Sequence, residues 1–187
     1  MPILRLLSLV LLLGGFALAQ SPTYGVGTVA TAEQIRAWDI SISPKGEELP
    51  PGRGTPKEGA ALFRQKGCAG CHGATAKGAA APTLVRDEAG SAAKPWDWGR
   101  VLPIRAPYAT TVWDYINRGM PLNREGTLTA DEVYSIVAFL LNLNGVIPDD
   151  AVMDAQSLPK VRMPNRETWA PLPDWKPGAD RLEGYPY

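Results

Sequence analysis

Apolar residues recur at helical spacing in three stretches of the chain, and the longest stretch lies between residues 129 and 144. It opens with Thr129 and Glu132, a pair that can cap the first helical turn reciprocally. One face then carries Val133, Ile136, Val137, Leu140 and Leu141 at intervals of one, three or four residues. Gly145 follows as a natural helix end. This pattern predicts a helix with one buried face.

Two shorter helices are predicted upstream. Residues 55–58, Thr-Pro-Lys-Glu, form a second capping box with proline at the first helical position, and they predict a helix to about Lys66. Its small or apolar face carries Gly59, Ala60, Ala61 and Phe63. The helical spacing of Val112, Tyr115 and Ile116 predicts another helix from Thr111 to Arg118. The chain therefore reads as all-α, with about three main helices.

The remaining segments lack periodicity and are rich in turn formers, with 18 prolines and 19 glycines in 187 residues. We expect one domain over residues 55–145, between extended, loop-rich arms at residues 20–54 and 146–187. Trp38 and Ile40 are the expected anchors of the first arm. The second arm keeps four large aromatic residues: Trp169, Trp175, Tyr185 and Tyr187. Because disordered tails are normally poor in aromatics, we expect it to pack on the domain or on a partner.

Residues 1–19 have the pattern of a secretory signal peptide. Arg5 supplies the positive start, residues 6–16 are apolar but short for a bilayer span, and Ala17-Leu18-Ala19 fits the cleavage pattern. We expect an exported, soluble, periplasmic chain that begins near Gln20, with an uncleaved membrane anchor as the alternative. Loss of Arg5 leaves 18 basic (19 − 1) against 19 acidic residues, so no basic excess points to nucleic acid.

Residues 68–72, Cys-Ala-Gly-Cys-His, contain both cysteines and the single histidine of the chain. C-x-x-C-H is the attachment motif of a c-type haem: each thiol adds to one vinyl group, and the adjacent imidazole binds the iron. A structural zinc site needs about four ligands, usually Cys or His, and three such residues exist here. A thioredoxin-like pair requires a βαβ context, and a disulfide between Cys68 and Cys71 closes a very small, strained loop. The motif predicts one covalent haem c, with His72 on the iron.

The sixth iron ligand must be a methionine, a weaker group or nothing, because a second histidine does not exist. Met120, Met153 and Met163 remain after signal cleavage. A soft thioether suits low-spin haem iron and raises its reduction potential. The haem also brings two propionates, for which guanidinium, indole N–H and phenol O–H groups are suitable partners. The candidates are Arg100, Arg105, Tyr108, Trp113 and Arg118.

Three helices, with C-x-x-C-H after the first and Met-Pro before the last, resemble the class I cytochrome c fold. Gly59 and Phe63 resemble the face through which that family crosses its first and last helices. Four parts of the chain resemble the cytochrome subunits of molybdenum sulfite dehydrogenases and SoxD-type sulfur-oxidation proteins: residues 107–121, residues 128–134 with 143–145, residues 158–166 and, upstream, residues 38–40 followed by 49–52. The resemblance implies a class I cytochrome c domain around one haem.

The resemblance also implies roles for single residues. The carbonyl of Pro82 accepts a hydrogen bond from His72 and fixes the imidazole tautomer. Met120, in Gly119-Met120-Pro121, takes the position of the axial ligand. Met163, which also precedes a proline, is its competitor.

These residues predict an electron-transfer protein rather than an enzyme. The resemblance implies that it accepts single electrons from a molybdenum sulfite dehydrogenase and passes them to another cytochrome or a terminal oxidase. It is either a free carrier or a stable dehydrogenase subunit. The alternatives are a subunit of a different periplasmic dehydrogenase, a peroxidase-like enzyme with an open distal site, and an assembly module in which haem is a structural staple.

Overall fold

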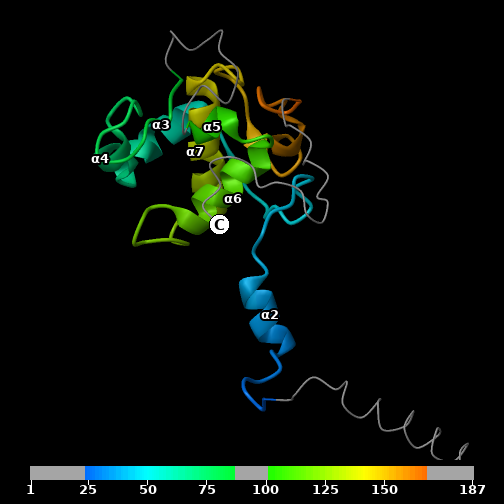
Figure 1. The fold of residues 1–187 in the computed structure, drawn as a ribbon. Coiled ribbons are helices and arrows are strands. Elements are labelled where there is room, and N and C mark those ends of the chain that lie inside the picture. Colours follow the sequence, from blue (N-terminus) through cyan, green and yellow to red (C-terminus); the bar gives the residue numbers. More distant parts are fainter. Residues whose placement is uncertain (1–23, 87–100, 168–187) are drawn as a thin grey trace, which may run out of the picture. The chain divides into compact units, whose positions relative to one another are not determined.

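The structure, a computed structural model, describes residues 24–86 and 101–167. It divides into two compact units, Met1–Asp39 and Ile40–Tyr187. The helices of the second unit are α3 (Pro56–Gln65), α4 (Cys68–His72), α5 (Leu102–Arg105), α6 (Ala109–Gly119) and α7 (Ala130–Leu143) (Figure 1). Two short antiparallel strands, β1 (Arg53–Gly54) and β2 (Met153–Asp154), and a 3₁₀ turn, η3 (Leu158–Lys160), complete it. The predicted all-α class is confirmed.

The predicted capping boxes start α3 and α7. Thr55 N–H donates to Glu58 Oε2 at 2.9 Å, and Glu58 N–H donates back to Thr55 Oγ1 at 3.3 Å. Thr129 and Glu132 make the same reciprocal pair, at 3.0 and 3.4 Å. These contacts satisfy backbone donors that the first helical turn otherwise leaves unpaired. Both helices therefore begin where the sequence places them.

The crossing of α3 and α7 depends on a glycine. A Cβ at Gly59 would lie 1.9 Å from the carbonyl oxygen of Ser135 and 2.6 Å from Phe139 Cβ. One turn later Phe63, which is 2% exposed, packs its ring against that of Phe139 with centroids 5.4 Å apart. The absence of a side chain at Gly59 lets the two backbones approach closely, and Phe63 fills the space beside them.

Helix α7 is the centre of the core. It contacts α3, α5, α6, β1 and β2, and Figure 1 shows it running between the other helices of this unit. Its buried side chains include Val133, Tyr134, Ile136, Val137, Leu140 and Leu141. The Tyr134 ring packs against Trp113 of α6, with centroids 5.5 Å apart. These helices fix where α4 and the end of α6 lie.

Irregular segments on both sides of the helices pack on this core. Tyr134 Oη donates to the carbonyl of Pro50 at 2.9 Å, and Leu49 is buried. After α7, Met153, Leu158 and Met163 are buried in the same hydrophobic cluster. The aromatic residues expected to anchor the rest of the C-terminal arm, from Trp169 onward, lie outside the described residues.

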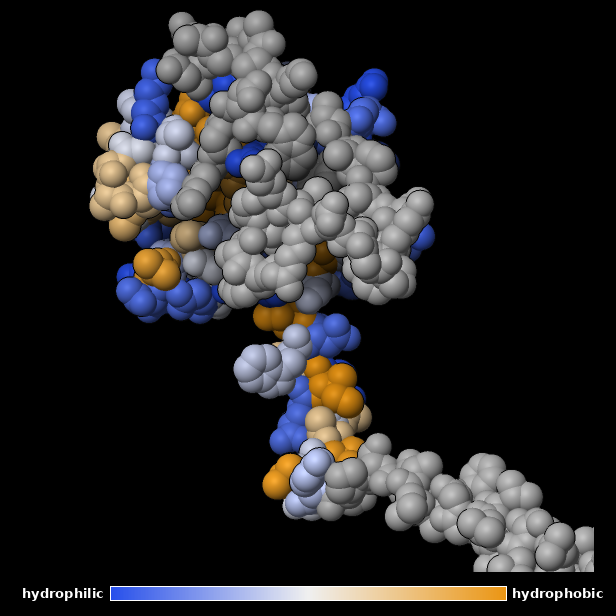
Figure 2. Space-filling view, viewed as in Figure 1, coloured by the Kyte–Doolittle hydropathy of each residue, from blue (hydrophilic) through white to orange (hydrophobic). Residues whose placement is uncertain are grey.

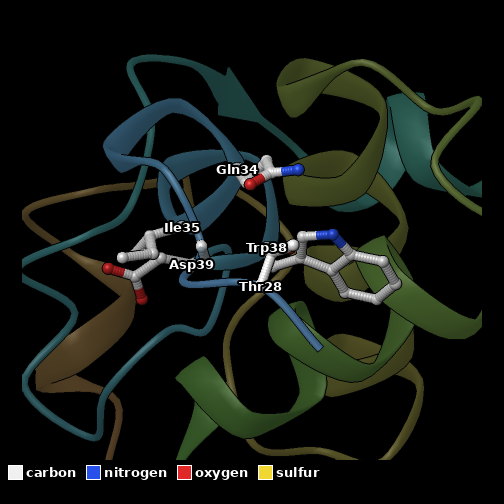
Figure 3. A pocket seen from close by; sticks show the side chains of 6 residues that line it. Thr28, Gln34, Ile35, Trp38 and Asp39 are labelled. Atoms are coloured by element: carbon white, nitrogen blue, oxygen red, sulfur yellow. The ribbon is translucent and has the colours of Figure 1, made fainter. Parts of the chain in front are cut away.

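Residues 24–40 differ from the predicted extended arm. They contain helix α2 (Ala32–Trp38), which starts with a capping box between Thr31 and Gln34. The expected anchors are not buried: Trp38 is 87% and Ile40 49% exposed. Figure 2 shows apolar side chains on the surface of this segment. A shallow pocket is lined by Thr28, Ala30, Gln34, Ile35, Trp38 and Asp39 (Figure 3), and none of the predicted site residues lines it.

Two further differences from the prediction concern the start of α6 and an additional short helix, α5. Helix α6 begins at Ala109, before the predicted Thr111, because Ala109 and Thr110 are buried and packing extends the helix beyond its periodic part. Helix α5 was not predicted; it is a single turn that carries Pro103 and buries Ile104. Within the described ranges, none of the helices has the length and apolar character to cross a membrane.

Candidate haem-attachment site

Helix α4 brings the three chemically distinctive residues of the chain onto one turn. Residues three and four apart share a helix face, so Cys68, Cys71 and His72 lie on the same side. Cys68 is half-buried and packs against the core, whereas Cys71 is exposed, and both thiols are free. Burial raises the pKa of the Cys68 thiol. The arrangement presents two thiols and an imidazole together, which a c-type haem requires.

The imidazole of His72 has a defined orientation. Its Nδ1 lies 2.9 Å from the carbonyl oxygen of Pro82. A carbonyl can only accept, so Nδ1 carries the proton and Nε2 keeps the lone pair that binds a metal. The intervening loop is held to α4 by two backbone hydrogen bonds, from Gly78 N–H to His72 O at 2.8 Å and from Ala81 N–H to Cys71 O at 2.9 Å. The histidine is therefore preorganised for axial ligation.

Asn144 fixes the next part of the same loop, and sequence reasoning assigned it no role in the site. It is 7% exposed at the end of α7. Its amide donates to Leu84 O at 2.9 Å, and its carbonyl accepts from Arg86 N–H at 2.8 Å. Asn144 is the only polar residue among positions 133, 136, 137, 140, 141 and 144 of the apolar helical repeat, and this is the signal that could have identified it.

Trp113 carries a buried donor without an acceptor. The side chain is 2% exposed, and its Nε1–H has no hydrogen-bond partner among the described residues. A buried unpaired N–H costs about 1–3 kcal/mol. A haem propionate would supply the missing acceptor, so this atom and the one-faced C-x-x-C-H turn both fit a haem.

Three of the other predicted propionate partners make contacts with protein groups. The ring of Tyr108 lies under the guanidinium of Arg166, with 4.1 Å from Cζ to the ring centroid. The backbone carbonyl of Arg105 accepts from the buried Asn165 amide. Arg118 pairs with Asp114 one turn earlier on α6. Arg100 lies outside the described residues.

The two candidate methionines occupy different environments. Met120 follows α6 directly, is half-buried, and donates its N–H to Ile116 O at 3.0 Å. Met163 is 2% exposed and belongs to the hydrophobic core. In Figure 1, α4 and the loop after α6 lie on the same side of α7, whereas residues 150–167 lie on the other side. Met153 is also buried in the core.

Comparison with known proteins agrees with this geometry. The sequence model of the cytochrome c family matches residues 56–144, which include α3, the C-x-x-C-H turn, α6 and α7. No curated protein sequence matches the chain. In the crystal structure of the sulfane dehydrogenase SoxCD from Paracoccus pantotrophus, one chain is 37% identical to this one, with a TM-score of 0.66. That similarity covers 80% of this chain and 72% of the other.

The family match implies haem c as the cofactor, and the C-x-x-C-H turn carries the residue types that attach such a haem. The helical fold, the glycine-dependent crossing of α3 and α7, and the oriented His72 are consistent with that cofactor. The chain belongs to the cytochrome c family, as a class I c-type cytochrome that resembles SoxD.

Proposed function

We propose that this chain is an exported, periplasmic monohaem cytochrome that accepts single electrons from a molybdenum sulfite dehydrogenase or a closely related sulfur-compound dehydrogenase. It passes them to another cytochrome or a terminal oxidase. The observation that carries the proposal is the α4 turn, where two thiols share one face with an imidazole whose Nδ1 is held by Pro82. The likeness to a sulfane dehydrogenase supports a sulfur-compound dehydrogenase as the donor.

The geometry supports the proposed ligand set. Cys68 and Cys71 would hold the porphyrin by thioether bonds, and His72 Nε2 and Met120 Sδ would be the two protein ligands of its iron. Haem c supplies a one-electron ferrous/ferric couple. Met120 is half-buried, so its thioether is available to bind a metal, whereas the core position of Met163 favours a packing role. Trp113 Nε1–H holds one propionate.

Methionine ligation favours electron transfer over catalysis at the iron. A thioether on the distal side closes the position that a peroxidase leaves open, and the chain has no second histidine to act as a distal acid or base. The protein then sets the potential and the docking surface, while no substrate bond is made or broken.

Stopped-flow mixing tests the donor. The oxidised cytochrome is mixed with sulfite and a catalytic amount of the dehydrogenase of the same organism, and reduction is followed in the visible haem bands. We expect reduction that depends on both sulfite and enzyme. Reduction by a different dehydrogenase, with none from the sulfite system, would contradict the sulfite assignment and keep the electron-transfer function.

A further inference from the structure

The last turn of α6 determines where the proposed ligand lies. Met120 comes directly after Gly119, the final residue of α6, and its N–H still bonds to Ile116 within that helix. A small rotation of this turn would move the thioether away from the iron. Contacts that hold the turn therefore act on the ligand without touching it.

Asp114 makes such contacts. It lies on α6 and is 8% exposed. Oδ1 accepts from Arg118 Nε at 2.9 Å, and Oδ2 accepts from Arg118 Nη2. This two-point pairing closes the last turn of α6 immediately before Gly119.

The same carboxylate joins α6 to a distant segment. Asp114 Oδ1 also accepts from the backbone N–H of Ile42 at 3.1 Å, across 72 residues of sequence. Two residues further on, the carbonyl of Pro44 accepts from Thr110 Oγ1, near the start of α6, at 3.4 Å. Residues 42–44 therefore make two hydrogen bonds to α6. The helix is stabilised by this neighbouring segment in addition to the Asp114–Arg118 pair within it.

We propose that Asp114 is a positioning residue for the axial ligand. Its pairing with Arg118 and Ile42 fixes the end of α6 and keeps Met120 on the iron. The inference rests on the proposed role of Met120. It assigns to Asp114 and Arg118 a function distinct from propionate binding.

Imidazole binding to the ferric protein measures how readily Met120 leaves the iron. We expect Asp114→Asn to bind imidazole about tenfold more tightly than wild type, because charge-assisted hydrogen bonds to the turn are lost. Its far-red sulfur-to-iron absorption band should also disappear at a lower temperature. Asp131→Asn is the matched control, since Asp131 Oδ1 likewise accepts a backbone N–H from the upstream segment, that of Arg53 at 2.8 Å, but at the start of α7.

The outcomes distinguish the role of Met120 as the axial ligand from the role of Asp114 in positioning it. Loss of the band in Met120→Ala establishes the ligand, whereas its retention overturns the proposed ligand set. If Met120 is the ligand and the imidazole affinity of Asp114→Asn stays within twofold of that of Asp131→Asn, the positioning role is wrong. Arg118→Gln keeps the Ile42 contact and loses the ion pair, so it must shift the affinity in the same direction if Asp114→Asn does not fold.

Discussion

At the scale of single residues, one hydrogen bond is enough to orient His72, the proposed iron ligand. One carbonyl, that of Pro82, fixes which nitrogen keeps its proton. Trp113 shows the opposite situation, because its buried N–H has no hydrogen-bond partner among the described residues. A haem propionate would supply the missing acceptor. The orientation of His72 and the unpaired N–H of Trp113 both bear on how the chain would hold haem c.

The axial ligand is tested by two methionine variants. We expect Met120→Ala to lose the far-red sulfur-to-iron band of the oxidised protein, because the thioether that produces it is gone. Met163→Ala should keep the band and lose about 2–5 kcal/mol of stability, since it empties a core position. Visible spectra and urea unfolding measure the two effects. The reverse pattern of spectra would assign the ligand to Met163.

The role of Trp113 is tested by the pH dependence of the reduction potential. A donor to a propionate stabilises its charged form and lowers its pKa. The potential falls as pH rises through that pKa, because the new negative charge favours ferric iron. We expect Trp113→Phe to move this fall to higher pH in spectroelectrochemical titrations. Superimposable profiles would show that the indole does not contact a propionate.

At the scale of elements, two close approaches determine the scaffold. The first is the α3–α7 crossing at Gly59. We expect Gly59→Ala to destabilise the protein by about 4 kcal/mol or more, because the new Cβ would lie 1.9 Å from Ser135 O. Gly70→Ala is the control, since a Cβ there meets nothing within 4 Å. Thermal unfolding of both variants and of wild type measures the effect. A melting temperature of Gly59→Ala equal to that of Gly70→Ala would contradict the close approach of α3 and α7 at Gly59.

The second is the contact of α7 with the upstream arm through Tyr134. Burial, with a smaller effect of Asp154, raises the pKa of Tyr134 to about 12. Unfolding returns it to about 10, so its contribution to stability is complete below pH 10 and is lost as pH rises toward 12. Tyr134→Phe should therefore lose less stability over this range. At neutral pH it should be about 1 kcal/mol less stable, because the bond to Pro50 is removed.

Urea unfolding at several pH values checks the Tyr134 prediction. Parallel losses of stability in wild type and Tyr134→Phe between pH 10 and about 12 would show that another group titrates.

The helices α3 and α7, which begin with a capping box, were predictable from the sequence, whereas a helix that depends on tertiary packing was not. Thr55 and Thr129 carry complete capping boxes, so α3 and α7 start as predicted. Helix α5 has no side-chain cap hydrogen bond, and it buries Pro103 and Ile104 in the core. Trp38, the expected anchor of the N-terminal arm, is 87% exposed on α2, and its anchoring role stays a prediction.

The haem-binding motif was readable because C-x-x-C-H is local, whereas its supports are not. Asn144 reaches Leu84 across 60 residues, and Asp114 reaches Ile42 across 72. Such pairs are set by how helices pack, so a single sequence gives no spacing from which to infer them. The sequence could name Trp113 as a candidate, but only the structure shows that its N–H is buried and unpaired.

At the scale of the whole molecule, irregular segments from both sides of the helices cover one core. Residues 42–54 and 146–167 supply Leu49, Met153, Leu158 and Met163 to it and pair as β1 and β2. Residues 24–39 belong to a separate unit with exposed apolar side chains. The core therefore extends beyond the part of the chain that carries the cytochrome c match.

The most direct test of the account is the intact mass of the exported protein, with the haem spectrum of the same sample in alkaline pyridine. We predict the mass of the processed polypeptide plus one haem, which stays attached after acid extraction, and a spectrum equivalent to one haem c per chain. A colourless protein with the mass of the bare polypeptide would contradict the thioether attachment at Cys68 and Cys71, and with it the proposed function.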